Sequence, residues 1–144
     1  MTEKAKPKYA LGLDFGTNSV RTLIVDIRNG DEVGTAIFNY PTGQAGIILD
    51  AKNPNLARQN PADWLAGIEA TVNRAAAEAG KKVRDFNPND IIGIGVDTTG
   101  STPLPVDRSG KPLAFYKEFK RNPNAQAWLW MKTAPLDGPS SGIG

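Results

Sequence analysis

Two aspartates, each at the end of a glycine-containing apolar segment, are the residues of this sequence best suited to chemistry. Asp14 ends "ALGLD" and Asp97 ends "IIGIGVD". Side chains alternate between the two faces of a strand, so each aspartate shares a face with glycines. Glycine weakens a strand and often marks the close approach of a ligand. In a plainer interpretation the glycines receive a helix and the aspartates cap turns. The same pattern occurs in both segments, however, and this repetition favours a ligand site in which two carboxylates lie beside a surface of glycines.

A polar turn, Gly16-Thr17-Asn18-Ser19, follows Asp14 and is itself followed by Arg21. Backbone N–H groups in such a turn form a concave site for an anion, and arginine prefers phosphate or carboxylate. A carboxylate repels a neighbouring phosphate unless a cation lies between them, and Mg²⁺ is the usual cation. The sequence therefore predicts a hairpin whose tip holds a magnesium-bound polyphosphate. The run "GIGVDT" departs from the GxGxxG dinucleotide motif, and no Walker A motif occurs.

The composition excludes several other kinds of site. The chain has 144 residues, 40% of them hydrophobic and 22% charged, with a net charge of +2 spread along the sequence. This dispersed charge argues against nucleic-acid binding, and no apolar run is long enough to span a membrane. The absence of cysteine and histidine excludes disulfides, thiolate metal sites and a Ser-His-Asp triad. We expect a one-domain cytoplasmic protein with a solvated tail at residues 1–8.

Alternation and turn signals predict three strands in the first 40 residues. They cover residues 9–15, 20–25 and 33–40, and the Asn-Gly pair of "RNGDE" predicts the second hairpin. The chain therefore opens as a three-stranded antiparallel meander. Residues 41–60 are rich in Gly, Pro, Asn and Gln and are expected to form a long loop.

A helix and a fourth strand are expected to follow. Asn60 suits the N-cap, Pro61 the first helical position and Gly80 the stop. The stripe expected to pack this helix on the sheet consists of Trp64, Ile68, Val72, Ala75 and Ala79. The apolar run of residues 91–97 is typical of a buried parallel strand. The β-β-β-α-β order predicts a mixed α/β sheet and not the all-parallel Rossmann order.

The last third of the sequence carries weaker signals. We expect a short hairpin that turns at residues 107–110 and a second helix that begins at Asn122 or Asn124. Trp128 and Trp130 cannot share one helix face, so one is expected in the core and the other exposed. Residues 133–144 are rich in Pro, Gly and Ser and are expected to be flexible.

These motifs resemble those of the FGGY carbohydrate kinases, members of the actin-like ATPase superfamily with a ribonuclease H-like fold. The segment "GLDFGTNSVRTLIVD" is similar to their opening phosphate motif. The segments "GVDTTGSTPLPVD" and "NPNAQAWLWMK" are most similar to the ribulokinase branch. The resemblance covers residues 9–132 and implies the incomplete first domain of a two-domain sugar kinase. It does not extend to residues 133–144.

The resemblance implies phosphorylation of a ketopentose, typically L-ribulose to its 5-phosphate, with ATP and Mg²⁺. By motif position, Asp14 would help to hold the magnesium. The nucleotide phosphates would be contacted by Thr17, Asn18, Ser19 and Arg21. The sugar would be bound by Asp97, Thr99, Gly100 and Ser101. The family's catalytic base is expected beyond the end of this sequence, so we assign no catalytic residue and expect the chain alone to be inactive.

Three alternatives stay open at this point. The substrate could instead be that of another FGGY kinase, of the xylulose or glycerol type. The chain could also be a non-catalytic protein that binds sugar or phosphate, or a truncated product without a function. In each case an incomplete sheet would expose apolar strand edges, from which we expect self-association.

Overall fold

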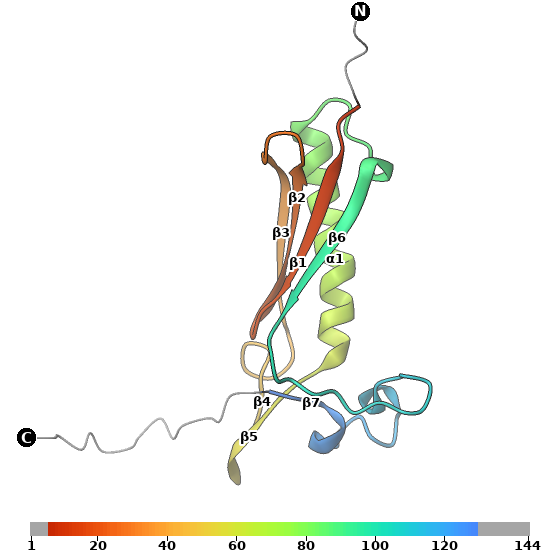
Figure 1. Cartoon of the computed structure of the whole chain (residues 1–144). Coiled ribbons are helices and arrows are strands. Elements are labelled where there is room, and N and C mark those ends of the chain that lie inside the picture. Colours follow the sequence, from red (N-terminus) through yellow and green to blue (C-terminus); the bar gives the residue numbers. More distant parts are fainter. Residues whose placement is uncertain (1–5, 130–144) are drawn as a thin grey trace, which may run out of the picture.

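The computed structural model describes residues 6–129, and in it one long helix covers one face of a four-stranded sheet (Figure 1). In spatial order the strands of this sheet are β3 (Glu32–Asn39), β2 (Ser19–Asp26), β1 (Tyr9–Phe15) and β6 (Ile91–Thr98). A smaller sheet lies beyond the carboxyl ends of β1 and β6 (Figure 1). It is built from β4 (Ile48–Asp50), β5 (Asn53–Gln59) and β7 (Ala127–Trp128).

The large sheet confirms the predicted topology. Strand β2 pairs antiparallel with both β1 and β3, whereas β6 pairs parallel with β1. The first strand has the predicted bounds, and the next two differ from the predicted bounds by one residue at each end. A mixed α/β sheet results, because the long helix carries the chain from the small sheet back to a parallel strand beside β1.

The helix α1 (Pro61–Lys82) begins as predicted and ends later than predicted. Asn60 caps it, accepting a hydrogen bond from the N–H of Ala62 (3.1 Å). The predicted stop at Gly80 is wrong. The helix runs on to Lys82, which forms an ion pair with Glu78 one turn earlier (2.6 Å), so the last turn has a side-chain interaction of its own.

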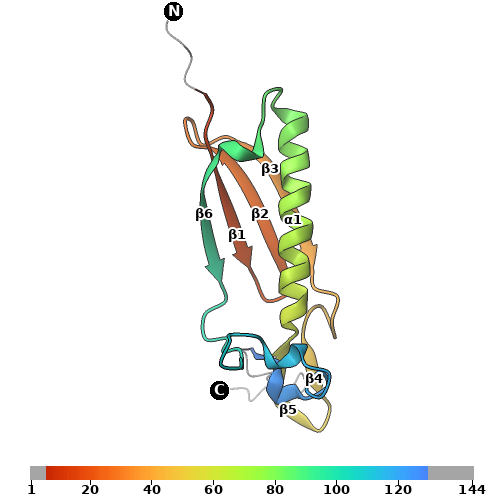
Figure 2. The same cartoon turned by 90° about the vertical axis from the view of Figure 1, so that its right-hand side faces the viewer.

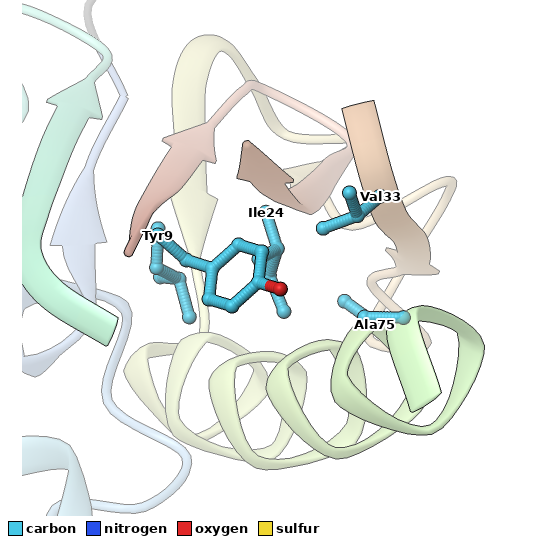
Figure 3. Close-up of a cluster of buried hydrophobic side chains, with 6 residues drawn as sticks. Tyr9, Ile24, Val33 and Ala75 are labelled. Atoms are coloured by element: carbon cyan, nitrogen blue, oxygen red, sulfur yellow. The ribbon is translucent and has the colours of Figure 1, made fainter. Parts of the chain in front are cut away.

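The core lies between α1 and the sheet (Figure 3). Its buried side chains are Tyr9, Leu11, Ile24, Val33, Ala75 and Ala79. One buried polar contact joins the layers, since the hydroxyl of Thr22 on β2 donates to that of Thr71 on α1 (2.6 Å). The predicted helix stripe is only partly right. Trp64, Ile68 and Val72 are half-buried, because α1 contacts chiefly β2 and β3 and leaves the β6 side of the sheet uncovered.

Three further expectations are wrong. Residues 41–60 form the β4–β5 hairpin as well as loop, because β5 finds a partner in the distant β7. The second helix is a single 3₁₀ turn, Pro123–Ala125, capped by Asn122, after which the chain enters β7. Strand β6 is an edge strand and not buried: Ile94 is 67% exposed.

Other expectations for the last third are met in part. The turn at residues 107–110 is confirmed, since the N–H of Gly110 donates to the carbonyl of Asp107 (3.0 Å). An isolated antiparallel bridge between Val106 and Pro112 flanks this turn. Two short 3₁₀ turns, Pro88–Asp90 and Leu113–Phe115, complete the described elements. Trp128 is 43% exposed, and Trp130 lies outside the described residues. Residues 1–5 of the predicted tail at 1–8 and the whole predicted tail at 133–144 lie outside them too. Within residues 6–129, no helix is both long and apolar enough to cross a membrane.

Candidate functional site

The carboxyl ends of β1 and β6 lie side by side (Figure 2) and bring the two predicted aspartates together. In the parallel register Gly12 is the partner of Gly95, and Asp14 is the partner of Asp97. Partner residues of neighbouring strands point to the same face of a sheet. Both aspartates are exposed. The sheet therefore presents two adjacent carboxylates at its carboxyl edge, where open α/β sheets hold ligands.

A hollow of about 660 Å³ opens at this edge. It is lined by Asp14, Phe15, Gly16, Thr17, Asp97, Thr98, Thr99, Gly100 and Ser101. Most of the predicted site residues thus meet around one space, with the hairpin tip on one side and the segment after β6 on the other. Asn18, Ser19 and Arg21 do not line the hollow, although Arg21 is the cross-strand partner of Asp14 on β2.

The glycines beside the two aspartates do not receive the helix. A Cβ added at Gly93 or Gly95 would meet nothing within 4 Å, and at Gly12 it would meet only a backbone oxygen at 4.0 Å. The close contacts between α1 and the sheet are instead at Gly34 of β3 and Gly67 of α1. The carboxylates of Asp14 and Asp97 accept no hydrogen bond from residues 6–129, so they do not cap turns. The plainer interpretation is therefore wrong on both counts.

The tip of the β1–β2 hairpin leaves backbone donors free. The N–H of Gly16 donates to the carbonyl of Ser19 (2.9 Å), whereas those of Thr17 and Asn18 find no acceptor among the described residues. Neighbouring free N–H groups in a turn form a small anion site. The side chain of Asn18 is engaged elsewhere, because its Nδ2 donates to the carbonyl of Ala45 (2.7 Å). Arg21 is exposed and makes no ion pair within the described chain.

The segment after β6 forms the other wall of the hollow. The N–H of Thr99 donates to the carbonyl of Phe15 (3.1 Å), which continues the pairing of β6 with β1 beyond the strands. Ser101 has φ of 57°, an unusual backbone conformation for a residue with a side chain. A residue keeps such a conformation only where the surrounding structure holds it, and such residues are concentrated at binding and active sites.

Two residues near the site were not identified as site residues from the sequence. Trp64 lines a second cavity of about 240 Å³ together with Phe15, Gly16, Thr98, Thr99 and Thr102. Its helical spacing indicated a core residue, and only the tertiary structure places it against the end of β6. Gln59 donates from Nε2 to the carbonyl of Thr17 (2.7 Å). It lies in a segment predicted to be loop, so no sequence signal connected it to the hairpin.

The carboxylate oxygens and backbone N–H groups at this edge fit a magnesium ion that is shared with a phosphate. Within residues 6–129 no three acidic residues come close enough to hold a metal ion by themselves. Mg²⁺ is commonly bound through one or two carboxylates, with phosphate oxygens and water as its other ligands. Asp14 offers one carboxylate that accepts no hydrogen bond from the described protein, beside free N–H groups for the phosphate, and Asp97 is its neighbour on β6.

Residues 9–128 match the model of the N-terminal domain of the FGGY family of carbohydrate kinases. The chain is 37% identical over 123 residues to the ribulokinase of Vibrio parahaemolyticus, covering 85% of this chain and 21% of that protein. It is also 37% identical over 134 residues to the ribulokinase of Geobacillus thermodenitrificans, covering 90% and 23%. The chain thus spans little more than a fifth of the length of these relatives.

Solved structures of two sugar kinases share the fold. A xyloylose kinase from Brucella ovis aligns with a TM-score of 0.55 at 23% identity, covering 72% of this chain and 19% of that one. A gluconate kinase from Lactobacillus acidophilus aligns with a TM-score of 0.53 at 19% identity, covering 74% and 18%. These two likenesses concern the fold alone and confirm the expected actin-like ATPase architecture. Through the match over residues 9–128, the chain belongs to the FGGY family of carbohydrate kinases.

Proposed function

We propose that this chain is the first part of an ATP-dependent kinase for a ketopentose, with L-ribulose as its substrate and the 5-phosphate as its product. One observation carries the proposal. The parallel register of β1 and β6 brings Asp14 beside Asp97, next to the free N–H groups of Thr17 and Asn18. The sugar is proposed from the relatives, which are named ribulokinases.

In this proposal the β1–β2 hairpin and the end of β6 with the segment after it bind different parts of the reactants. Asp14 would hold the magnesium ion, which when bound neutralises charge on the phosphates of ATP. The phosphates would be contacted by Thr17, Asn18, Ser19 and Arg21. The sugar hydroxyls would meet Asp97, Thr99, Gly100 and Ser101. Phosphoryl transfer depends mainly on positioning and charge neutralisation, so a site without histidine or cysteine is adequate for these tasks.

Ligand binding by the 144-residue chain tests the proposal without requiring turnover. Mg-ATP and L-ribulose would be titrated calorimetrically into the wild type, D14N, D97N and a control, D85N. Asp85 is exposed and belongs to the turn after α1, away from the hollow. We expect D14N to weaken Mg-ATP binding by about tenfold or more, because removing a charged ligand costs a charge-assisted interaction. D97N should weaken sugar binding, and D85N should change neither.

A panel of sugars separates the proposed substrate from its alternatives. L-ribulose would be compared with D-xylulose, glycerol and gluconate in the same titration. Tighter binding of another member of the panel would replace L-ribulose as the proposed substrate, while the proposal of a carbohydrate kinase would stand. If the wild-type chain bound neither Mg-ATP nor any of these compounds, the proposed use of the hollow would be wrong.

A further inference from the structure

The segment that joins β3 to α1 forms three hydrogen bonds with the tip of the β1–β2 hairpin. The N–H of Tyr40 donates to the carbonyl of Asn18 (2.9 Å), and Nδ2 of Asn18 donates to the carbonyl of Ala45 (2.7 Å). Nε2 of Gln59 donates to the carbonyl of Thr17 (2.7 Å). The carbonyls of Thr17 and Asn18 thus both accept hydrogen bonds from residues of this segment.

Of these three contacts, the one from Gln59 depends on a buried side chain. Gln59 is 1% exposed, is paired with Ala127 of β7 and directly precedes Asn60, the N-cap of α1. Its Oε1 is buried and has no hydrogen-bond partner in the described chain. An apolar side chain would avoid burying this unpaired oxygen. Within residues 6–129, the bond to Thr17 is therefore the one polar contact of the side chain that offsets its burial.

Because the peptide unit is planar, the hydrogen bond to the Thr17 carbonyl also fixes the direction of the neighbouring N–H. No peptide bond in the described chain is cis, and a trans peptide is planar, with its C=O and N–H pointing opposite ways. The carbonyl of Thr17 and the N–H of Asn18 belong to one such unit. Because Gln59 holds the carbonyl, the N–H of Asn18 points away from Gln59, and it is one of the two free donors at the tip.

We infer that Gln59 is a positioning residue, which fixes the Thr17–Asn18 peptide so that its N–H faces a bound phosphate. Without this bond the peptide can rotate and turn its carbonyl, the negative end of its dipole, towards the anion. The inference rests on the proposed function for the identity of the ligand, but not for the orientation of the peptide. It also connects the hairpin tip to β5, β7 and α1 through one side chain.

Gln126 provides a matched control for the test. It too is buried, at 6% exposed, its Nε2 donates to a backbone carbonyl, that of Lys120 (3.1 Å), and its Oε1 has no partner in the described chain. Although it directly precedes Ala127, the strand partner of Gln59, its amide donates to Lys120 and not to the hairpin tip. The variants Q59L and Q126L thus remove equivalent amides, and Q59E places a carboxylate against the carbonyl of Thr17.

The test uses backbone amide resonances of the 144-residue chain, first without ligand and then with Mg-ATP. Without ligand, Q59L should shift the Asn18 amide and change its exchange rate with solvent, whereas Q126L should leave it unchanged. With Mg-ATP, Q59L should bind about tenfold more weakly than the wild type, as expected for one lost hydrogen bond to a charged ligand. Q59E should bind more weakly still, because its carboxylate repels the carbonyl that it faces.

The outcomes separate this inference from the proposed function. If the Asn18 amide of Q59L matches that of the wild type, or shifts equally in Q126L, the positioning role is wrong. If the amide shifts only in the Gln59 variants and phosphate binding weakens with it, the role is established. If the amide shifts as expected but the wild type binds no Mg-ATP, the peptide is held as inferred and the proposed function is what fails.

Discussion

At the scale of single residues, the aspartates of this chain have very different surroundings. Asp26 is buried at the end of β2 and accepts hydrogen bonds from both the backbone and the guanidinium of Arg28. Asp14 and Asp97 are exposed and accept none from the described chain. A carboxylate that serves the fold is satisfied by the protein itself, whereas one that serves a ligand must keep its oxygens free. This contrast supports a binding role for Asp14 and Asp97.

The pair of Asp26 and Arg28 should make stability depend on pH in the acid range. Hydrogen bonds from Arg28 lower the pKa of Asp26 to about 2, below the value near 3.9 of an unfolded chain. A lowered pKa in the folded state contributes stability above the unfolded pKa, and this contribution is lost as pH falls through the folded value. We expect the wild type to unfold at a higher temperature than D26N at pH 5 and above, with the gap narrowing between about pH 4 and pH 2.

Thermal unfolding of wild type, D26N, R28Q and the double variant, followed by circular dichroism, provides the check. R28Q should reproduce the loss, and the double variant should unfold no earlier than D26N alone, because the pair is then already broken. A gap between wild type and D26N that stays constant from pH 5 to pH 2 would contradict the assignment.

At the scale of elements, glycines on the two faces of the sheet serve different purposes. Gly34 on β3 lies against α1, where an added Cβ would come within 2.2 Å of the carbonyl oxygen of Ala75. Gly95 on β6 faces the opposite side, where an added Cβ meets nothing within 4 Å. The first glycine permits the close approach of two elements, and the second keeps open space beside Asp97.

These positions predict opposite effects of one substitution. G34A should destabilise the fold by about 1–3 kcal/mol, since a backbone carbonyl of α1 must move to accommodate the methyl group. G95A should change stability by no more than about 0.5 kcal/mol, as is usual for a substitution that touches nothing. Urea unfolding measures both. Similar losses in the two variants would mean that the open face of β6 is packed in solution.

How far the sequence predicts an element depends on where its partners lie. The meander, the start of α1 and the parallel strand β6 followed from local alternation and caps, which need no distant contact. Strand β5 pairs with β7 some 70 residues later in the chain, so residues 53–59 read as loop. Asn122 caps a turn as predicted, but a cap signal does not fix the length of the helix. Of the site, the repeated aspartates could be predicted, whereas the contact between Gln59 and Thr17 depends on that distant pairing.

At the scale of the whole molecule, the two edges of the large sheet differ. At β3, the N–H of Thr35 donates to Glu78 of α1 (3.0 Å), so the helix satisfies part of that edge. At β6, no strand in the described chain pairs with the outer edge. Ile94 and Val96 are 67% and 61% exposed on the face that α1 shares. An open edge strand with large apolar side chains is a template for pairing with another chain.

We therefore predict that the 144-residue chain self-associates through β6. Pairing of two copies along this edge would satisfy its free backbone groups and would bring the exposed Ile94 and Val96 of both copies together. Lysine on an edge strand prevents such pairing, because burying it against a second copy desolvates its charge. The double variant I94K/V96K should accordingly sediment as a monomer at concentrations where the wild type forms larger species.

Ile37 on β3 supplies the matched control, since it is 48% exposed but points to the other face and lies on the other edge strand. I37K also replaces an exposed apolar side chain by lysine, adding one positive charge where I94K/V96K adds two. It therefore reduces nonspecific apolar association without altering β6. Sedimentation velocity over a concentration series should show I37K behaving as the wild type does. If I37K dissociates the chain as well as I94K/V96K does, the association is unspecific. If the wild type is monomeric throughout the series, the open edge of β6 does not pair.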